Sequence, residues 1–276
     1  SLGAALRAAR SECGDAELDV VHAGALISYR RADATAAAAV NVDATRALLA
    51  AARAADVRCF LYVSSVVTVG VASSADAELD EDAVFNGDER SHYVATKRAA
   101  EQLVLAEREL DVRVVNPGVI HGVGSRPSNS NRFLQRIARG QLPPLVPPGS
   151  LSVVAVEDVA EGILRAFERG RRGRRYLLTE SNLRLSELYR RAGDELGVRI
   201  PRLRAGPRTW SAVCAAAALL DRVRPLELAT PQALRLLGRH LCFSSRRARN
   251  ELGWAPEPFE RVLPRVLASL SERGWL

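Results

Sequence analysis

Short apolar runs alternate with longer amphipathic segments along the first 180 residues. The apolar runs predict buried strands at residues 19–25, 58–66, 112–120, 152–156 and 174–179. Between them, apolar residues recur every three or four positions, as they do on one face of a helix, and predict helices at 1–12, 36–55, 92–107, 132–139 and 158–169. Strands that alternate with helices through short connections predict an α/β fold with a Rossmann-like, doubly wound parallel sheet.

The pattern changes after residue 181 and becomes mostly helical. Five helices are predicted there, at 186–196, 209–223, 231–240, 246–252 and 258–273. The stretch from Trp210 to Leu220 carries no charge and predicts a buried helix, because it is too short to cross a bilayer. We therefore expect two parts, a Rossmann-like NAD(P)-binding domain at 1–124 and 151–180 and a smaller, mostly helical substrate-binding lobe at 125–150 and 181–276.

Composition and charge are those of a soluble globular protein. The chain has 276 residues, of which 47% are hydrophobic and 26% charged. Its net charge of +7 is scattered over amphipathic helices and only 5% of residues are aromatic, so we expect a solvated arginine-rich surface with no nucleic-acid partner and no membrane partner. The four cysteines have neither metal-site nor CxxC spacing, which predicts no metal site and a reducing, cytoplasmic compartment.

The candidate chemistry lies in two segments about 30 residues apart. Ser65 follows a predicted strand, and the carboxyl end of a strand is where open α/β sheets bind their ligands. Tyr93 and Lys97 are four residues apart at the start of a predicted helix and so share one face. Lys97 is also the only lysine in the chain, which indicates that a compact ammonium is needed there. We expect a hydroxyl, a phenol and an ammonium to converge on one carbonyl group.

Seven segments follow one another in a characteristic order and spacing. They lie at 22–25, 41–45, 63–70, 93–97, 116–122, 156–160 and 243–254. Together they resemble the extended short-chain dehydrogenase/reductase family, which includes NAD-dependent epimerases and dehydratases, dihydroflavonol reductases and 3β-hydroxysteroid dehydrogenases. Family members begin with a glycine-rich βαβ unit, and this sequence starts beyond it. We expect a truncated copy, and the alternative is a sheet that has lost half of its dinucleotide site.

The resemblance implies a cofactor, NAD or NADP, and a set of site residues. Ser65, Tyr93 and Lys97 would be catalytic, Asn41 would support Lys97, and the ammonium of Lys97 would lower the pKa of Tyr93. The predicted cofactor-binding residues are His22, Ala23, Gly24, Ala25, Val63, Ser64, Tyr93, Lys97, Asn116, Pro117, Gly118 and Val119. The family also implies a homodimer that pairs the helices at 36–55 and 92–107.

The predicted reaction is hydride transfer between a nicotinamide cofactor and a small-molecule ketone or secondary alcohol. The stretch at 151–156 lacks the Arg, Asp and His usual in the sugar-nucleotide branch, and the turn at 116–118 has the form found in dihydroflavonol-reductase-like and hydroxysteroid-dehydrogenase-like members. Two alternatives stay open, a nucleotide-sugar epimerase or dehydratase and a non-catalytic scaffold.

Other polar residues favour structural roles. We expect Asp158 to cap the helix that follows it, and His240 to be a packing residue. His121 is expected to be structural or to lie near the cofactor, whereas Tyr29 and Trp210 fit either a substrate lid or plain core packing.

Overall fold

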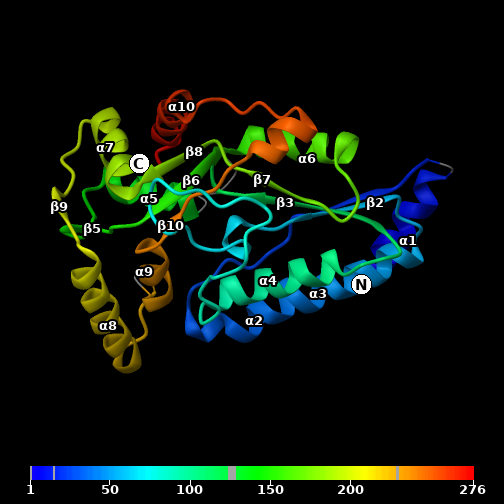
Figure 1. Ribbon diagram of the computed structural model, residues 1–276, viewed down its shortest axis with the longest axis horizontal. Helices are drawn as coiled ribbons and strands as arrows, with labels where there is room; N and C mark the ends of the chain where they lie inside the picture. The colour runs from blue at the N-terminus through cyan, green and yellow to red at the C-terminus, as the bar shows by residue number, and fades with distance from the viewer. Residues whose placement is uncertain (1, 15, 124–128, 228–229) are drawn as a thin grey trace.

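A parallel four-stranded sheet forms the centre of the protein, as the computed structural model shows (Figure 1). The structure describes residues 2–14, 16–123, 129–227 and 230–276. The strand order is β1 (Asp19–His22), β2 (Cys59–Val63), β3 (Asp111–Pro117) and β7 (Arg175–Leu178), and every neighbouring pair is parallel. The carboxyl ends of β1, β2 and β3 therefore meet at one edge of the sheet.

Helices cover both faces of this sheet, which confirms the predicted doubly wound α/β fold. Figure 1 shows α1 (Leu2–Cys13), α2 (Ala34–Ala38), α3 (Ala44–Ala54) and α4 (His92–Leu105) below it and α6 (Val156–Arg169) above it, whereas α10 (Phe259–Glu272) lies above a second sheet. Successive side chains of a strand point to opposite faces. Phe60 and Tyr62 accordingly pack against α3 and α4 on one face, whereas Leu61 packs against α6 on the other. The expected homodimer through α2, α3 and α4 stays a prediction.

A second, smaller sheet extends the first toward the carboxyl-terminal part of the chain. It contains β4 (Val119–His121), β6 (Ser150–Ala155) and β10 (His240–Leu241), with β8 (Ser181–Arg184) antiparallel to β6. Beside it, β5 (Leu145–Val146) pairs with β9 (Leu203–Arg204), and α5 (Asn129–Ala138) and α7 (Leu185–Leu196) pack against its core. Within the range 151–180 that we assigned to the Rossmann-like domain, β7 thus lies in the first sheet and β6 in the second.

The helical segments differ from the prediction in three places. The predicted helix at 36–55 is divided by a π-helical turn, η2 (Ala39–Asp43). α9 (Pro231–Leu237) ends before His240, which belongs to β10, and the predicted helix near 246–252 is largely another π-helical segment, η4 (Ala248–Leu252). Residues 124–128 of the predicted loop at 123–130 lie outside the described residues.

Two of the predictions for single elements were wrong. Ala155 is the N-cap residue of α6, and Asp158 lies inside the first turn, where its Oδ2 accepts a hydrogen bond from the amide of Glu257 at 3.1 Å. The helix α8 (Pro207–Val223) is mostly exposed, and Trp210 is its one buried residue. It packs on α9 at the outside of the molecule (Figure 1), so most of its apolar side chains are not part of a hydrophobic core.

Gly118 sits between β3 and β4, where the chain passes from one sheet to the other. A Cβ at this position would lie 2.7 Å from the carbonyl oxygen of Ser152 on β6. We expect Gly118→Ala to lower the free energy of unfolding in urea by roughly 1–3 kcal/mol, because the neighbouring backbone cannot move aside without breaking strand pairing. Gly3→Ala, in α1, is the control and should be neutral or slightly stabilising. Equal effects of the two changes would contradict this view of the junction.

Candidate active site

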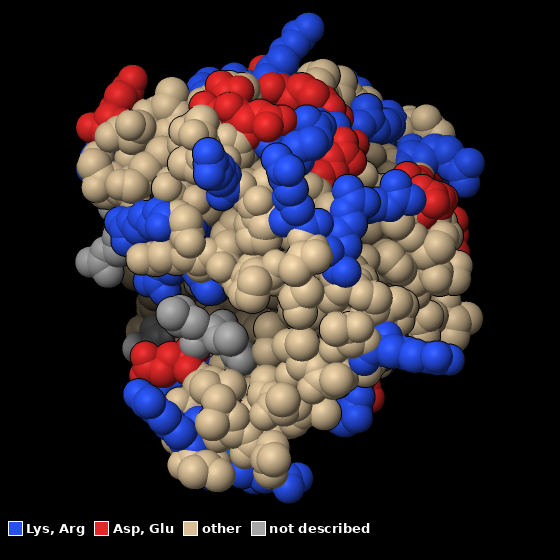
Figure 2. Space-filling view, turned by 90° about the vertical axis from the view of Figure 1, so that its left-hand side faces the viewer, with Lys and Arg blue, Asp and Glu red and all other residues tan. Residues whose placement is uncertain are grey.

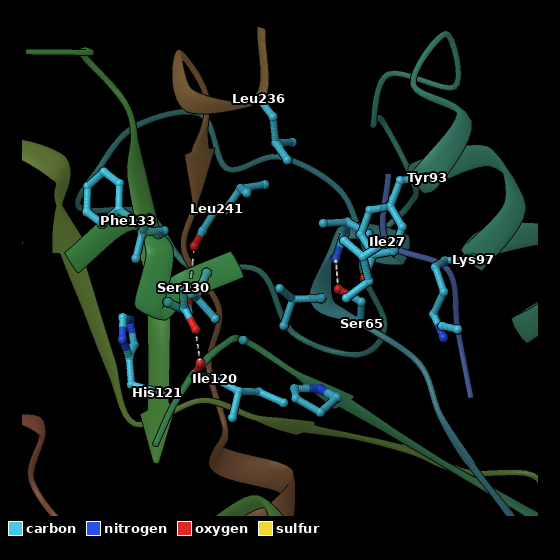
Figure 3. Close-up of a pocket in the computed structure, with 18 of the residues that line it drawn as sticks. Ile27, Ser65, Tyr93, Lys97, Ile120, His121, Ser130, Phe133, Leu236 and Leu241 are labelled. Carbon is cyan, nitrogen blue, oxygen red and sulfur yellow. Dashed lines mark hydrogen bonds between the residues drawn. The ribbon is translucent and has the colours of Figure 1, made fainter. Parts of the chain in front are cut away.

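A cavity of about 630 Å³ lies where the two sheets meet. The carboxyl ends of three strands reach it: Ala23 and Ala25 follow β1, Ser65 follows β2, and Pro117 ends β3. The helices α4, α5, α7 and α9 and the strands β4, β6 and β10 supply most of the remaining wall. Figure 3 shows Ser65, Tyr93 and Lys97 on one side of this space and His121 and Phe133 on the other. The cavity thus brings together the three residues that were predicted to be catalytic.

Hydrogen bonds to its backbone carbonyl oxygen hold Ser65 in position. Its carbonyl oxygen accepts hydrogen bonds from Thr68 Oγ1 at 2.8 Å and from Asn116 Nδ2 at 3.2 Å. Its Oγ accepts the amide of Val67 at 3.4 Å and so caps the short 3₁₀ helix η3 (Val66–Thr68). Its hydroxyl proton can be donated to the phenol oxygen of Tyr93 or to another acceptor in the cavity.

Lys97 carries a buried ammonium group that has no carboxylate in contact with it among the described residues. Its side chain is only 1% exposed, and its Nζ donates to the Tyr62 hydroxyl and to the carbonyl oxygen of Val63, both at 2.8 Å. Nζ also lies 4.3 Å from the centroid of the Tyr62 ring, a favourable position for a cation. Burial lowers the pKa of Lys97 to about 8, although the charge of Glu101 acts in the opposite direction. The group therefore stays largely protonated at neutral pH.

Tyr93 does not have the lowered pKa that the sequence led us to expect. Burial raises the pKa of its phenol, and a hydrogen bond with Ser65 opposes this rise. The ammonium of Lys97 is engaged with Tyr62 and Val63, so its effect on Tyr93 does not outweigh desolvation. The ring of Tyr29 packs against that of Tyr93 at 5.6 Å and also lines the cavity. Tyr93 is thus a protonated phenol at neutral pH.

Asn41 lies in the π-helical turn and links three elements. Its Oδ1 accepts the amide of Leu26 at 2.7 Å, and its Nδ2 donates to the carbonyl of Leu26 at 3.1 Å and to Thr96 Oγ1 at 3.0 Å. It holds the segment after β1 against α4 and reaches Lys97 only through the adjacent Thr96. A π turn in this position is typical of functional sites, because it redirects one side chain from a helix.

The other predicted cofactor-binding residues divide into two groups. Those that line the cavity are Ala23, Ala25, Val63, Ser64, Tyr93, Lys97, Pro117, Gly118 and Val119. His22, Gly24 and Asn116 are not among its lining residues. The Nε2 of His22 lies 2.8 Å from Thr45 Oγ1, and because that hydroxyl donates its proton to the carbonyl of Asn41, His22 Nε2 is the donor. Burial and the charge of Lys97 lower the pKa of His22 to about 4, so it is a neutral structural residue.

A buried polar network beneath Ser65 was not predicted from the sequence. Glu101 accepts hydrogen bonds from Asn116 Nδ2 at 2.6 Å and Thr68 Oγ1 at 2.7 Å, and it pairs with Arg175 at 3.0 Å. Glu101 lies four residues after Lys97 and hence on the same face of α4. That spacing was the one available signal. The network ties β3, β7 and α4 to the loop that carries Ser65.

The opposite end of the cavity is apolar, apart from a few small polar residues. Its lining includes Phe133, Leu151, Leu185, Leu188, Ala233, Leu236, Leu237 and Leu241. His121 is fully buried there and packs on Phe259, and neither ring nitrogen has a hydrogen-bond partner among the described residues. Burial lowers its pKa to about 4, so it offers a neutral donor and acceptor. His240 does not line the cavity; its Nδ1 lies 3.1 Å from Ser150 Oγ. Trp210 also lies outside the cavity wall.

Known proteins resemble this chain over most of its length. The model of the NAD dependent epimerase/dehydratase family matches residues 10–178. A "sterol demethylase protein B" from Methylococcus capsulatus is 32% identical over 262 residues, which cover 92% of this chain and 79% of that protein. A 4-hydroxy-2-methyl-3-oxo-4-farnesyl-3,4-dihydroquinoline-1-oxide ketoreductase from Stigmatella aurantiaca is 32% identical, with coverage of 88% of this chain and 74% of that protein. The crystal structure of gox2253 is similar at a TM-score of 0.82 and 28% identity, over 100% of this chain and 82% of that one.

Burial of the Lys97 ammonium should reduce stability in a pH-dependent way. Because the pKa of Lys97 is about 8 in the folded protein against 10.5 as the ordinary value, the unfolded chain binds more protons between these values, and stability rises with pH in that window. We expect Lys97→Met to be the more stable protein at pH 7, by on the order of 1–3 kcal/mol, with the difference shrinking from pH 8 toward pH 10. Urea unfolding of both proteins across this range measures it. A difference that stays constant with pH would contradict the assigned burial cost.

Proposed function

The chain belongs to the NAD dependent epimerase/dehydratase family, and from this premise we propose that it is an NAD(P)-dependent oxidoreductase acting on a ketone or secondary alcohol. The observation that carries the proposal is that Ser65, Tyr93 and Lys97 line one cavity whose far end is apolar. A hydroxyl, a phenol and an ammonium at the carboxyl ends of parallel strands suit proton transfer to a carbonyl oxygen.

The residues present suit the nicotinamide half of the cofactor. Gly118 lacks a side chain where a Cβ would meet the backbone of Ser152, and Ala23 and Ala25 leave the chain after β1 uncovered. Lys97 would donate to the ribose hydroxyls, and the backbone of Pro117, Gly118 and Val119 would hold the carboxamide. When bound there, the nicotinamide supplies or accepts the hydride.

The protein's own residues would handle the proton. Tyr93 is protonated at neutral pH, which suits it to act as a general acid that donates its proton to the oxygen of a ketone as that oxygen gains charge. Ser65 would donate a hydrogen bond to the same oxygen and stabilise the developing negative charge. Lys97 would then stabilise the phenolate that Tyr93 becomes.

The cavity favours an apolar substrate over a sugar nucleotide. Among its lining residues, Lys97 is the single side chain that is charged at neutral pH, and it lies at the cofactor end. A nucleoside diphosphate needs several cationic or amide donors for its phosphates. A sterol and a farnesylated quinoline occur in the names of two similar proteins, and both are lipophilic. We therefore propose a bulky lipophilic ketone as the substrate class, with His121 placed to bind a second polar group.

Cofactor binding and turnover test the proposal together. We expect NADH or NADPH to bind in a fluorescence titration, and we expect the nicotinamide absorbance to fall when a steroid ketone, a flavanone or a prenylated quinolone is added. Binding of neither cofactor by the intact protein would overturn the proposal. Turnover of a nucleotide sugar without net cofactor oxidation would favour the epimerase alternative.

Removal of the Tyr93 hydroxyl should separate chemistry from binding. We expect Tyr93→Phe to lower kcat by roughly 10²–10⁴-fold, since the general acid is lost, while the affinity for the cofactor changes little. The control is Tyr189→Phe, which removes the hydroxyl of another buried tyrosine that does not line the cavity. Steady-state kinetics with the ketone that the wild-type protein reduces fastest would measure the change in kcat. A fall in kcat of less than tenfold would assign the proton to another group.

A further inference from the structure

The outward face of α8 is apolar although it is exposed to solvent. Ala212, Ala216, Leu219 and Val223 recur at three- and four-residue spacing and therefore share one face of the helix. Leu219, Leu220 and Val223 are 65%, 52% and 84% exposed. No residue from 209 to 220 is charged. A surface helix normally turns its apolar stripe toward the core, and this one turns apolar side chains outward as well.

The opposite side of α8 is attached to the body of the protein. Trp210 is buried, and its indole Nε1 donates to the carbonyl of Leu234 on α9 at 2.9 Å. A Cβ at Gly238 would lie 2.5 Å from the Trp210 ring, so the two segments are in close contact. α9 in turn contributes Leu236 and Leu237 to the cavity wall. The exposed helix is therefore an outer layer behind the wall that encloses the apolar end of the site.

Unpaired arginines flank this helix along the chain. Residues 199–224 contain one acidic residue, Asp221, whose carboxylate accepts the amide of Leu226 at 2.8 Å. The same range contains six exposed arginines, and within the described part of the chain none of them forms an ion pair: Arg199, Arg202, Arg204, Arg208, Arg222 and Arg224. Figure 2 faces this side of the molecule and shows uncharged surface at its lower end, where α8 lies, bordered by blue side chains and, at the lower left, by a red patch. Some exposed arginines elsewhere, such as Arg190 and Arg265, are paired, whereas others, such as Arg31 and Arg246, have no ion pair among the described residues.

We propose that the outward face of α8 docks on the surface of an anionic lipid bilayer. Leucine and valine side chains flanked by guanidinium groups match an acyl boundary beneath negatively charged headgroups. A nucleic acid would supply phosphates but no apolar layer for Leu219 and Val223. A second copy of the chain would place the same positive charges against one another across a two-fold contact.

This proposal revises the expectation from the sequence that no membrane takes part. Among the described residues, no helix is long and apolar enough to cross a membrane, and docking requires only that one face enters the interface. Bilayer contact at α8 would bring a lipophilic substrate beside the wall that α9 forms. The proposal stands on α8 alone and does not require that the proposed reaction be correct.

Sedimentation with lipid vesicles tests the proposal without any catalytic step. We expect the wild-type protein to bind vesicles of phosphatidylcholine with about one-third phosphatidylserine, to bind pure phosphatidylcholine vesicles much less, and to be released by salt. Leu219→Glu should lower the partition coefficient by about tenfold or more, because the side chain would no longer enter the interface. Arg222→Ala combined with Arg224→Ala should weaken binding to the anionic vesicles alone.

Matched variants separate this surface from general effects. Leu164→Glu changes an equally exposed leucine on α6, and Arg46→Ala with Arg90→Ala removes the same charge elsewhere, so both should bind as the wild type does. Thermal unfolding confirms that each variant is folded. Equal losses in the control and α8 variants, or no preference of the wild type for anionic vesicles, would overturn the proposal. So would a change of mass in analytical ultracentrifugation for Leu219→Glu without a change in vesicle binding, which would assign the face to self-association.

Discussion

The site depends on an ammonium group buried at the carboxyl end of a strand. Lys97 projects from α4 and donates to the carbonyl of Val63, the last residue of β2, and to the hydroxyl of Tyr62. This contact fixes the distance between α4 and the sheet, and thereby places Tyr93 near Ser65. It also carries a cost, because a desolvated ammonium loses part of its affinity for the proton. A residue that destabilises the fold in this way is expected where function requires the charge.

Around this contact the protein builds a polar end and an apolar end within one cavity. Glu101, Asn116 and Arg175 form a buried network that holds the loop of Ser65 from beneath. Beyond Gly118 the chain enters the second sheet, whose strands and helices provide the apolar wall. The close approach of Gly118 to Ser152 joins the two halves. In the proposed reaction, proton transfer and recognition of an apolar substrate would therefore come from separate sheets that meet at Gly118.

Much of this arrangement could be predicted from the sequence because it is local. The strand β2 is a continuous apolar run, β1 and β3 have valines at their centres, and Tyr93 and Lys97 share a helix face by their spacing alone. The pKa of Tyr93 could not be predicted, since it depends on how deeply the ring is buried and on what the ammonium of Lys97 contacts instead. The exposure of α8 could not be predicted either. Its apolar residues have the composition of a core helix, and only the tertiary position on α9 shows that they face outward. The strands β9 and β10 have two residues each, which is too short to produce a periodic signal.

In the proposed reaction, a lipophilic ketone in this cavity receives a hydride from the nicotinamide cofactor and a proton from Tyr93. The most direct measurement is a reduction carried out with NADH or NADPH that is deuterated at the transferable position, with the product analysed by mass spectrometry. We expect the wild-type protein to form an alcohol that carries one deuterium on the former carbonyl carbon. Tyr93→Phe should form almost none of this product. An unlabelled alcohol, or a labelled one formed equally well by the variant, would contradict the proposed reaction.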